Sequence, residues 1–184
     1  MEISKEDLIK DCRFYIDKRN LDRLTHQKIL NYKIQRKKVG MILRAVPNTS
    51  RIVTLAETRV YAYLTGTYEG EKEYDEYVKM CNAPFRNKES YDKLIDEMSK
   101  NPYDIKKCAV IVNQDDIICD GQHRCCYMLY KYGPNYKIDV VKFRYNEVRG
   151  FTSLIKYKCR VILAKLRATI ICNRSTLIRG IRKL

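Results

Sequence analysis

The chain contains no tryptophan and has two histidines, four prolines and seven glycines among its 184 residues. So little glycine and proline predicts no long flexible linker between domains. The eight cysteines form no Cys-x-x-Cys pair, and with so few histidines this spacing argues against a structural zinc site. Because a reducing cytosol keeps thiols free, we expect the cysteines to serve as small hydrophobic side chains.

Two further absences concern membranes and secretion. No run of about 18 uncharged apolar residues occurs, so no transmembrane helix is predicted. The first ten residues, MEISKEDLIK, are charged and polar where a signal peptide would be apolar. We therefore expect a cytoplasmic protein, with attachment to the inner face of the membrane as an open alternative.

Positive charge is in clear excess. The chain has 37 Lys or Arg against 22 Asp or Glu, a formal net charge of +15. Such an excess favours anionic partners, namely nucleic acid, acidic lipid head groups or phosphorylated small molecules. Charge alone does not choose among them.

The sequence divides into three parts, 1–48, 49–147 and 148–184. The first part is predicted to be a basic helical extension that begins with the capping-box pattern of Ser4 and Asp7. The stretch from Lys18 to Arg51, which covers most of this part and the residues just after it, has ten Lys or Arg and one acid. These basic residues form either a solvated face or an anion-binding face.

The middle part alternates strand and helix patterns, which predicts a small α/β (α+β) domain with a mixed sheet and short helices. Gly66 and Gly70 indicate a loop, Ser90 is a candidate helix cap, and 57–64 either extends a strand or forms a turn. Strands are expected over 51–55, 108–112, 117–119 and 138–143, and helices over 74–80, 91–99 and 125–132.

The last part is predicted to be a basic amphipathic helix. From Phe151 onward it has nine Lys or Arg and no acid. Its apolar residues share one helical stripe, which consists of Ile155, Cys159, Ile162, Leu163, Leu166 and Ile170. Basic side chains accompany that stripe: Lys156, Lys158, Arg160, Lys165 and Arg167. The helix either lies on an anionic membrane surface or packs on the domain with its basic residues exposed.

The most informative motif is Asp120-Gly121-Gln122-His123-Arg124, between a buried strand and an apolar helix. Gly121 permits a tight turn, and the amides at a helix start attract anions. Arg124 offers a planar fork of donors that matches phosphate oxygens. Asp120 is expected to cap the helix, orient His123 or bind a metal ion that accompanies phosphates. The motif therefore predicts a phosphate-binding loop.

In its setting this pentapeptide resembles the DGxHR-type loop of the ParB/sulfiredoxin superfamily. A helix like Leu94–Met98, a hairpin like 109–118, the loop, an apolar helix and a final strand follow in the order of that superfamily. The segment 51–77 is also similar to the start of ParB-like domains from bacterial surface-polysaccharide gene clusters. The resemblance covers about half the chain and implies a ParB/sulfiredoxin-like fold.

The branches of this superfamily imply different activities. Sulfiredoxins bind ATP phosphates and carry a catalytic Cys where this chain has Gln122, so their chemistry is not supported. Partitioning ParB proteins bind CTP with two adjacent arginines, of which this chain has Arg124 alone. In the free-serine kinase branch an acid after the first strand is the general base. Glu57 occupies a comparable place here and would act with His123, although a surface carboxylate is the simpler interpretation.

Three functions follow as hypotheses. The first is a kinase-like phosphotransferase that uses ATP, ADP or CTP, with Mg²⁺ accompanying the phosphates and a link to surface-polysaccharide metabolism. The second is a ParB-like DNA-binding protein, for which no helix-turn-helix follows the domain. The third is a non-catalytic adaptor on a membrane surface. A tyrosine cluster (Tyr61, Tyr63, Tyr68, Tyr74 and Tyr77) either lines a ligand pocket or simply packs.

Overall fold

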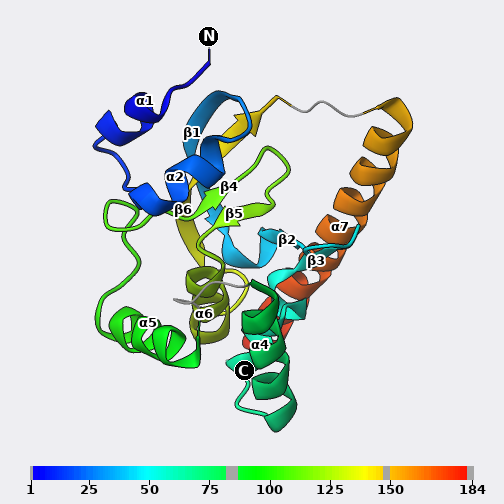
Figure 1. The fold of residues 1–184 in the computed structure, drawn as a ribbon. Coiled ribbons are helices and arrows are strands. Elements are labelled where there is room, and N and C mark those ends of the chain that lie inside the picture. The colour runs from blue at the N-terminus through cyan, green and yellow to red at the C-terminus, as the bar shows by residue number, and fades with distance from the viewer. Residues whose placement is uncertain (1, 82–86, 147–149, 182–184) are drawn as a thin grey trace.

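A four-stranded mixed sheet lies at the centre of the protein, and helices cover both of its faces (Figure 1). The computed structural model describes residues 2–81, 87–146 and 150–181. The strands are ordered β1 (Ile29–Lys38), β6 (Lys137–Tyr145), β4 (Ile111–Val112) and β5 (Ile118–Asp120). Strand β4 runs parallel to β6, and the other two pairings are antiparallel. The predicted α/β class with a mixed sheet is confirmed.

Two short helices, α1 (Lys5–Lys10) and α2 (Lys18–Thr25), cover one face of the sheet. Leu8 of α1 and Leu24 of α2 are buried against Val141 and Phe143 of β6. Helix α1 begins with the predicted capping box, because Ser4 and Asp7 each accept a hydrogen bond from the other's backbone amide. This layer fixes the position of α2, which forms part of the site described below.

The opposite face packs against a larger group of helices. These are α3 (Arg59–Tyr63), α4 (Tyr68–Cys81), α5 (Lys88–Lys100) and α6 (Gln122–Tyr132), with the 3₁₀ turns η1 (Val39–Met41) and η2 (Leu55–Glu57). Helix α6 is central to this layer, since Cys125 and Met128 are fully buried. Val110, just before β4, and Val112 in β4 pack against this layer of helices. Ile111, between them, packs against the layer of α1 and α2 on the opposite face.

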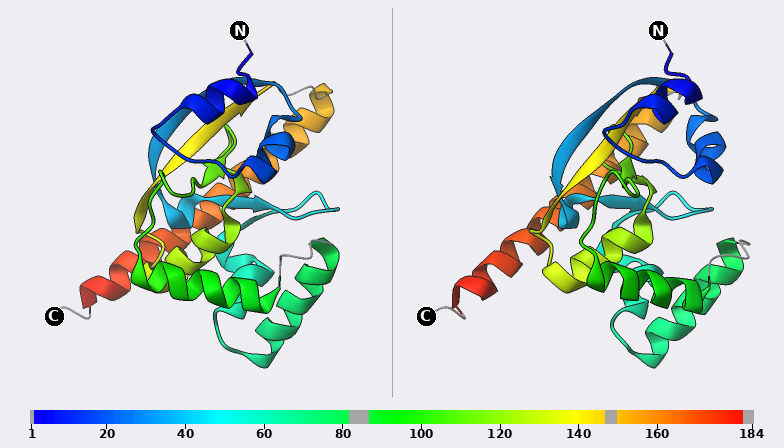
Figure 2. Two further views of the ribbon diagram at one scale, coloured as in Figure 1. Left: turned by 60° about the vertical axis from the view of Figure 1, so that its left-hand side comes forward. Right: turned by 90° about the vertical axis from the view of Figure 1, so that its left-hand side faces the viewer.

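A separate two-stranded hairpin touches the main sheet through a parallel bridge between Leu43 and Ile117. Strands β2 (Leu43–Ala45) and β3 (Ile52–Thr54) pair antiparallel, and the long helix α7 (Phe151–Ile181) packs on them through Tyr157, Val161 and Ala164. Figure 2 shows the hairpin projecting between α2 above and α4 below. The hairpin therefore forms a wall between the two helical layers.

The structure corrects the prediction for residues 1–48. They do not form a helical extension, because β1 is a ten-residue strand at the edge of the central sheet and pairs with β6 along its whole length. Tyr32 and Ile34, on either side of the exposed Lys33, pack on the core beneath α1 and α2. Lysines on an edge strand discourage pairing with another chain. The predicted boundary at 147/148 lies outside the described residues.

Several element boundaries also differ from the prediction. Gly70 lies inside α4 and not in a loop. A Cβ there would approach the carbonyl oxygen of Ala62 to 2.3 Å, so the close approach of α3 and α4 requires a glycine. The side chain of Asn87, not Ser90, caps α5. Residues 57–64 contain the last residue of η2, the helix α3 and its C-cap Leu64. Helix α6 begins at Gln122, three residues earlier than predicted, because Gly121 in the left-handed region lets the chain turn directly into it.

Candidate functional site

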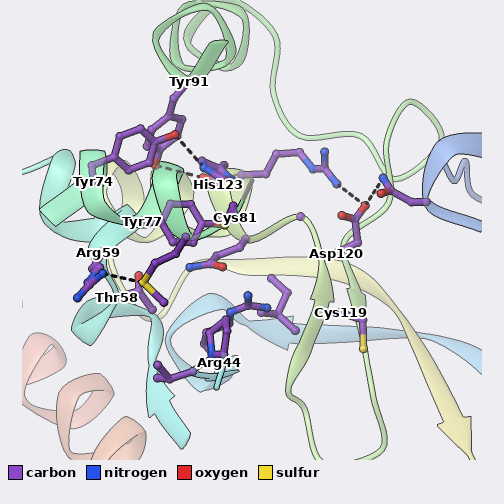
Figure 3. Close-up of a pocket in the computed structure, with 18 of the residues that line it drawn as sticks. Arg44, Thr58, Arg59, Tyr74, Tyr77, Cys81, Tyr91, Cys119, Asp120 and His123 are labelled. Carbon is purple, nitrogen blue, oxygen red and sulfur yellow. Dashed lines mark hydrogen bonds and ion pairs between the residues drawn. The ribbon is translucent and has the colours of Figure 1, made fainter. Parts of the chain in front are cut away.

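A cavity of about 770 Å³ lies where α2, the β2–β3 hairpin, α4, α5 and the start of α6 converge. All five residues of the predicted loop, Asp120 to Arg124, line it. Figure 3 shows His123 with Tyr74 and Tyr91 at one end, Asp120 at the other, and Arg44 facing them across the cavity. The loop thus forms one wall of a concave site.

Gly121 sets the geometry of that wall. Its φ of +87° is a conformation that side-chain-bearing residues rarely adopt, and a Cβ would lie 2.9 Å from Nη2 of Arg124 and 3.0 Å from Cγ2 of Val110. Gly121 is also the N-cap of α6 and offers no side chain to cap the helix. The positive end of the helix dipole is therefore presented to the cavity.

Asp120 holds cationic side chains in place and does not cap the helix. Its carboxylate oxygens lie 3.3 Å from Nη2 of Arg23, 3.4 Å from Nδ2 of Asn20 and 3.7 Å from Nη2 of Arg124. Arg23 also donates to the carbonyl of Cys119 at 2.8 Å. Asp120 thus joins helix α2 to the loop, and the predicted cap at the start of α6 is wrong.

Arg124 is folded back toward the strand before it. Its Nη2 donates to the carbonyl oxygen of Ala109 at 3.0 Å, and its side chain is 17% exposed. Its Nε is buried and has no hydrogen-bond partner within the described parts of the chain. A buried donor without a partner is costly, so this guanidinium retains unused binding capacity.

His123 belongs to an aromatic cluster. Its Nε2 lies 3.1 Å from the hydroxyl of Tyr74, and its ring meets that of Tyr91 edge-on with centroids 4.7 Å apart. Tyr91 also donates to the backbone carbonyl of His123 at 3.5 Å. Burial raises the pKa of both Tyr74 and Tyr91, so both keep their protons at neutral pH. The imidazole is thereby positioned by groups that do not ionise.

The predicted tyrosine cluster divides between two roles. Tyr74 and Tyr77 line the cavity, whereas Tyr61 packs edge-on against Tyr130 and Tyr68 is 78% exposed. The hydroxyl of Tyr63 donates a hydrogen bond to Asp92 at 2.9 Å. Burial of Tyr63, and to a smaller extent this hydrogen bond, raises its pKa to about 12. Tyr91, which was not part of the prediction, completes the wall.

Glu57 lines the same cavity but is already engaged. One oxygen accepts hydrogen bonds from the amide and hydroxyl of Thr54, at 2.8 and 2.9 Å, and so caps η2. The other oxygen lies 3.2 Å from Nη1 of Arg167 on α7. The candidate base is thus within the site, with each carboxylate oxygen in a structural contact.

The principal feature that the motif analysis missed is a set of arginines. Six of them line the cavity, against three acids, and no lysine is among the described lining residues. They are Arg19, Arg23, Arg44, Arg51, Arg59 and Arg124. Four of the six come from the basic stretch Lys18–Arg51, for which anion binding stays a prediction.

Arg44 differs from the other half-buried arginines of the cavity. Arg23 pairs with Asp120 and Arg59 with Glu76, whereas none of the described acids pairs with Arg44. It sits on β2 opposite Val53, which also lines the cavity. A partly buried guanidinium without an acid is a candidate for binding an anion from solution.

The thiols near the loop are poor nucleophiles. Burial raises the pKa of Cys119 to about 11, and burial likewise raises the pKa values of Cys125 and Cys126. Figure 3 shows the Cys119 sulfur pointing away from Asp120. All eight cysteines lie within the described residues and are free. Cys125, Cys126 and Cys172 are buried as small hydrophobic groups, as predicted, whereas Cys12 and Cys159 are exposed.

The basic residues predicted to face a membrane are divided by the structure. Lys158 binds Asp115 at 2.9 Å, Lys165 lies 3.3 Å from Asp116, and Arg167 pairs with Glu57. Lys156 is exposed and Arg160 is partly exposed. The first three residues therefore attach α7 to the domain, and the last two remain on its outer side.

Among the described residues there is no group of three or more His, Cys, Asp or Glu that could hold a metal ion. None of the described helices is long and apolar enough to cross a membrane. In comparisons with protein-family models, curated proteins and solved structures, the chain has no significant match. The geometry of the cavity is therefore the basis for assigning a function.

Proposed function

We propose that the cavity binds a phosphate-bearing small molecule, and that a nucleotide is the class that fits best. The observation that carries this proposal is the convergence of six arginines and the uncapped start of α6 on one concave site. Guanidinium groups bind phosphate oxygens through paired hydrogen bonds, and a helix N-terminus adds amides and a favourable dipole. The resemblance of the Asp120–Arg124 loop to a DGxHR-type loop points in the same direction.

The other end of the cavity suits a flat, partly apolar group. Tyr74, Tyr77 and Tyr91 supply aromatic surface beside His123, and Leu94 and Met80 add apolar lining. A volume of about 770 Å³ is within the usual range for small-molecule sites. A ligand with phosphates at the arginine end and a base or sugar at the tyrosine end would use both parts.

Phosphoryl transfer is the reaction class that this site would serve. In that reaction His123 and Arg124 would contact the transferred phosphate, and Glu57 would accept a proton from the acceptor hydroxyl. Mg²⁺ could share the phosphates with Asp120, provided that the carboxylate releases Arg23 or Asn20. Glu57 would likewise have to break its contact with Thr54 or Arg167 before it could accept a proton from the acceptor hydroxyl. Turnover would therefore require a rearrangement at η2 or α7.

The binding proposal is tested by thermal shift and calorimetry with ATP, ADP, CTP and GTP. We expect at least one nucleotide to stabilise the protein, and Arg44→Ala to weaken its binding by about tenfold or more, because a charge-assisted contact is lost. Arg44→Lys should recover part of the loss. The matched control is Arg36→Ala, since Arg36 is 64% exposed on β1, pairs with Asp139, and lies outside the cavity.

Two results would overturn the proposal. One is that no nucleotide changes the melting temperature. The other is that Arg44→Ala and Arg36→Ala behave alike. Turnover is examined separately by nucleotide hydrolysis, in which water takes the place of the acceptor hydroxyl and phosphate is released. Loss of release in Glu57→Gln with unchanged binding supports Glu57 as the base, and unchanged release removes that role.

A further inference from the structure

Helix α7 has two apolar faces, and one of them is exposed. Tyr157, Val161, Ala164, Ala168 and Cys172 are buried against the domain. The predicted stripe is on the other side: Ile155, Ile162, Leu163, Leu166 and Ile170 are 49–59% exposed, and Cys159 is exposed too. Contiguous exposed apolar surface of this kind marks an interaction site in a protein that has already formed its core.

The stripe is held rigidly by contacts on the flanks of the helix. The carboxylate of Asp115 binds the hydroxyl of Tyr157 at 3.0 Å and the ammonium of Lys158 at 2.9 Å. Farther along, Arg167 donates to the carbonyl of Ile52 at 3.1 Å. These contacts fix which side of α7 faces the domain, so the apolar stripe lies on the outer side of the helix.

Charge beside the stripe indicates the kind of partner. Lys156 and Arg174 are exposed and Arg160 is partly exposed, and no described acid pairs with any of them. The sequence from Phe151 to Leu184 contains no acid at all. A second copy of this helix would bring two acid-free helices together, and their like charges would repel. An anionic surface complements both the apolar stripe and its basic margin.

We propose that the outer face of α7 docks on an anionic lipid bilayer. The helix lies parallel to the membrane plane, with the apolar stripe at the boundary between head groups and acyl chains. Lys156, Arg160 and Arg174 extend their charged ends toward the acidic head groups. This inference rests on α7 and is independent of the ligand proposed for the cavity.

The test is co-sedimentation of the full chain with vesicles of phosphatidylcholine, alone or mixed with phosphatidylglycerol. We expect binding to the anionic vesicles only. The double variant Ile162→Ser/Leu166→Ser keeps every charge, and should lower the partition coefficient by about tenfold or more because two large apolar side chains no longer insert. The control is Ile9→Ser/Tyr130→Ser, which removes exposed apolar residues from α1 and α6.

A second pair of variants separates local charge from total charge. Lys156→Glu/Arg160→Glu should weaken binding by about tenfold or more, since each basic residue at the surface contributes. Lys72→Glu/Lys79→Glu on α4 makes the same change in net charge elsewhere and should have a much smaller effect. Far-ultraviolet circular dichroism and melting curves confirm that each variant is folded.

Three outcomes would overturn the proposal. They are equal binding to neutral and anionic vesicles, unchanged binding of Ile162→Ser/Leu166→Ser, and equal effects of the two charge variants. Analytical ultracentrifugation adds a fourth: a dimer that Ile162→Ser/Leu166→Ser dissociates would assign the stripe to a second copy of the chain.

Discussion

Gly121 is the residue on which the geometry of the loop depends most directly. A side chain there would be strained by the φ of +87° and would also collide with Arg124 and Val110. Gly66 offers a comparison, because its φ is +67° but no atom lies within 4 Å of its would-be Cβ. Substitutions at the two glycines therefore distinguish the cost of backbone strain from the cost of steric conflict.

We expect Gly121→Ala to lower the free energy of unfolding by about 2–4 kcal/mol, from backbone strain plus overpacking. Gly66→Ala should cost about 1 kcal/mol, because strain acts alone there. Urea denaturation followed by circular dichroism measures both. Equal losses would mean that the contacts of Gly121 relax without cost, and that the loop tolerates a side chain.

Asp116 is a buried carboxylate surrounded by lysines. Its oxygens lie 2.6 Å from Nζ of Lys142, 2.8 Å from Lys37 and 3.3 Å from Lys165. Burial alone would raise its pKa, but the hydrogen bonds from Lys142 and Lys37 outweigh burial and hold the pKa below its usual value. Its φ of +68° is a conformation that Asp and Asn tolerate better than other side chains.

The lowered pKa predicts acid sensitivity. A carboxylate whose folded pKa is depressed stabilises the fold above its unfolded pKa of about 3.9, and this stabilisation is lost as the pH falls through the folded value. Asp116→Asn keeps the backbone conformation but leaves the lysines uncompensated, and should cost about 3 kcal/mol at pH 7. Urea midpoints from pH 7 to pH 3 should fall less steeply in the variant. Parallel pH curves would contradict this assignment.

Among the strands, β1 shows where sequence reasoning failed. The stretch Ile29–Lys38 mixes lysines with Tyr32 and Ile34, and neither a helical nor a strand period dominates it. Its conformation is decided by β6, which pairs with it over nine positions but lies about 100 residues away in sequence. Local pattern cannot report a pairing partner, so the strand was assigned to a helix.

Only the residues of the site that are neighbours in sequence could be predicted. The strand, the Asp120–Gly121 turn and the following helix are neighbours in sequence, so their chemistry could be inferred. Arg44 and Arg59 come from β2 and α3, and they reach the cavity through tertiary packing. Similarly, periodicity identified the apolar stripe of α7, but small alanines on the other face decide which side packs on the domain.

Those alanines support a prediction about α7. Ala168 is fully buried against the hairpin, and its neighbour Thr169 is exposed. Ala168→Asp would bury an unpaired charge and should destabilise the protein by about 3 kcal/mol or more. Thr169→Asp adds the same charge to the solvent side and should cost less than about 1 kcal/mol. Limited proteolysis should detach α7 in the first variant only, and equal resistance would argue against tight docking.

The whole molecule carries +15, and this charge is spread beyond the cavity. Lysines dominate the outer strand β1, the tail carries both lysine and arginine, and the described lining of the cavity uses arginine. Diffuse positive charge attracts any polyanion at low salt, whereas a concave site with oriented donors selects a small phosphorylated molecule. The two kinds of binding should respond differently to ionic strength.

We expect duplex DNA to bind at about 20 mM NaCl and to lose most of its affinity by about 200 mM, because counterion release dominates. Nucleotide binding should fall much less over that range, since the cavity is partly screened from solvent. Fluorescence anisotropy with labelled DNA and with a labelled nucleotide provides both curves. DNA affinity that survives high salt would favour the nucleic-acid hypothesis instead.

Arg167 connects helix α7 to the wall of the cavity. The residue belongs to α7, yet its guanidinium holds Glu57 at the rim of the cavity. If a ligand in the cavity draws Glu57 away, this contact with α7 is lost. By thermodynamic reciprocity, docking of α7 that breaks the same contact would then change the affinity of the cavity by the factor by which the ligand changes docking. One ion pair thus links the wall of the cavity to the helix that carries the apolar stripe.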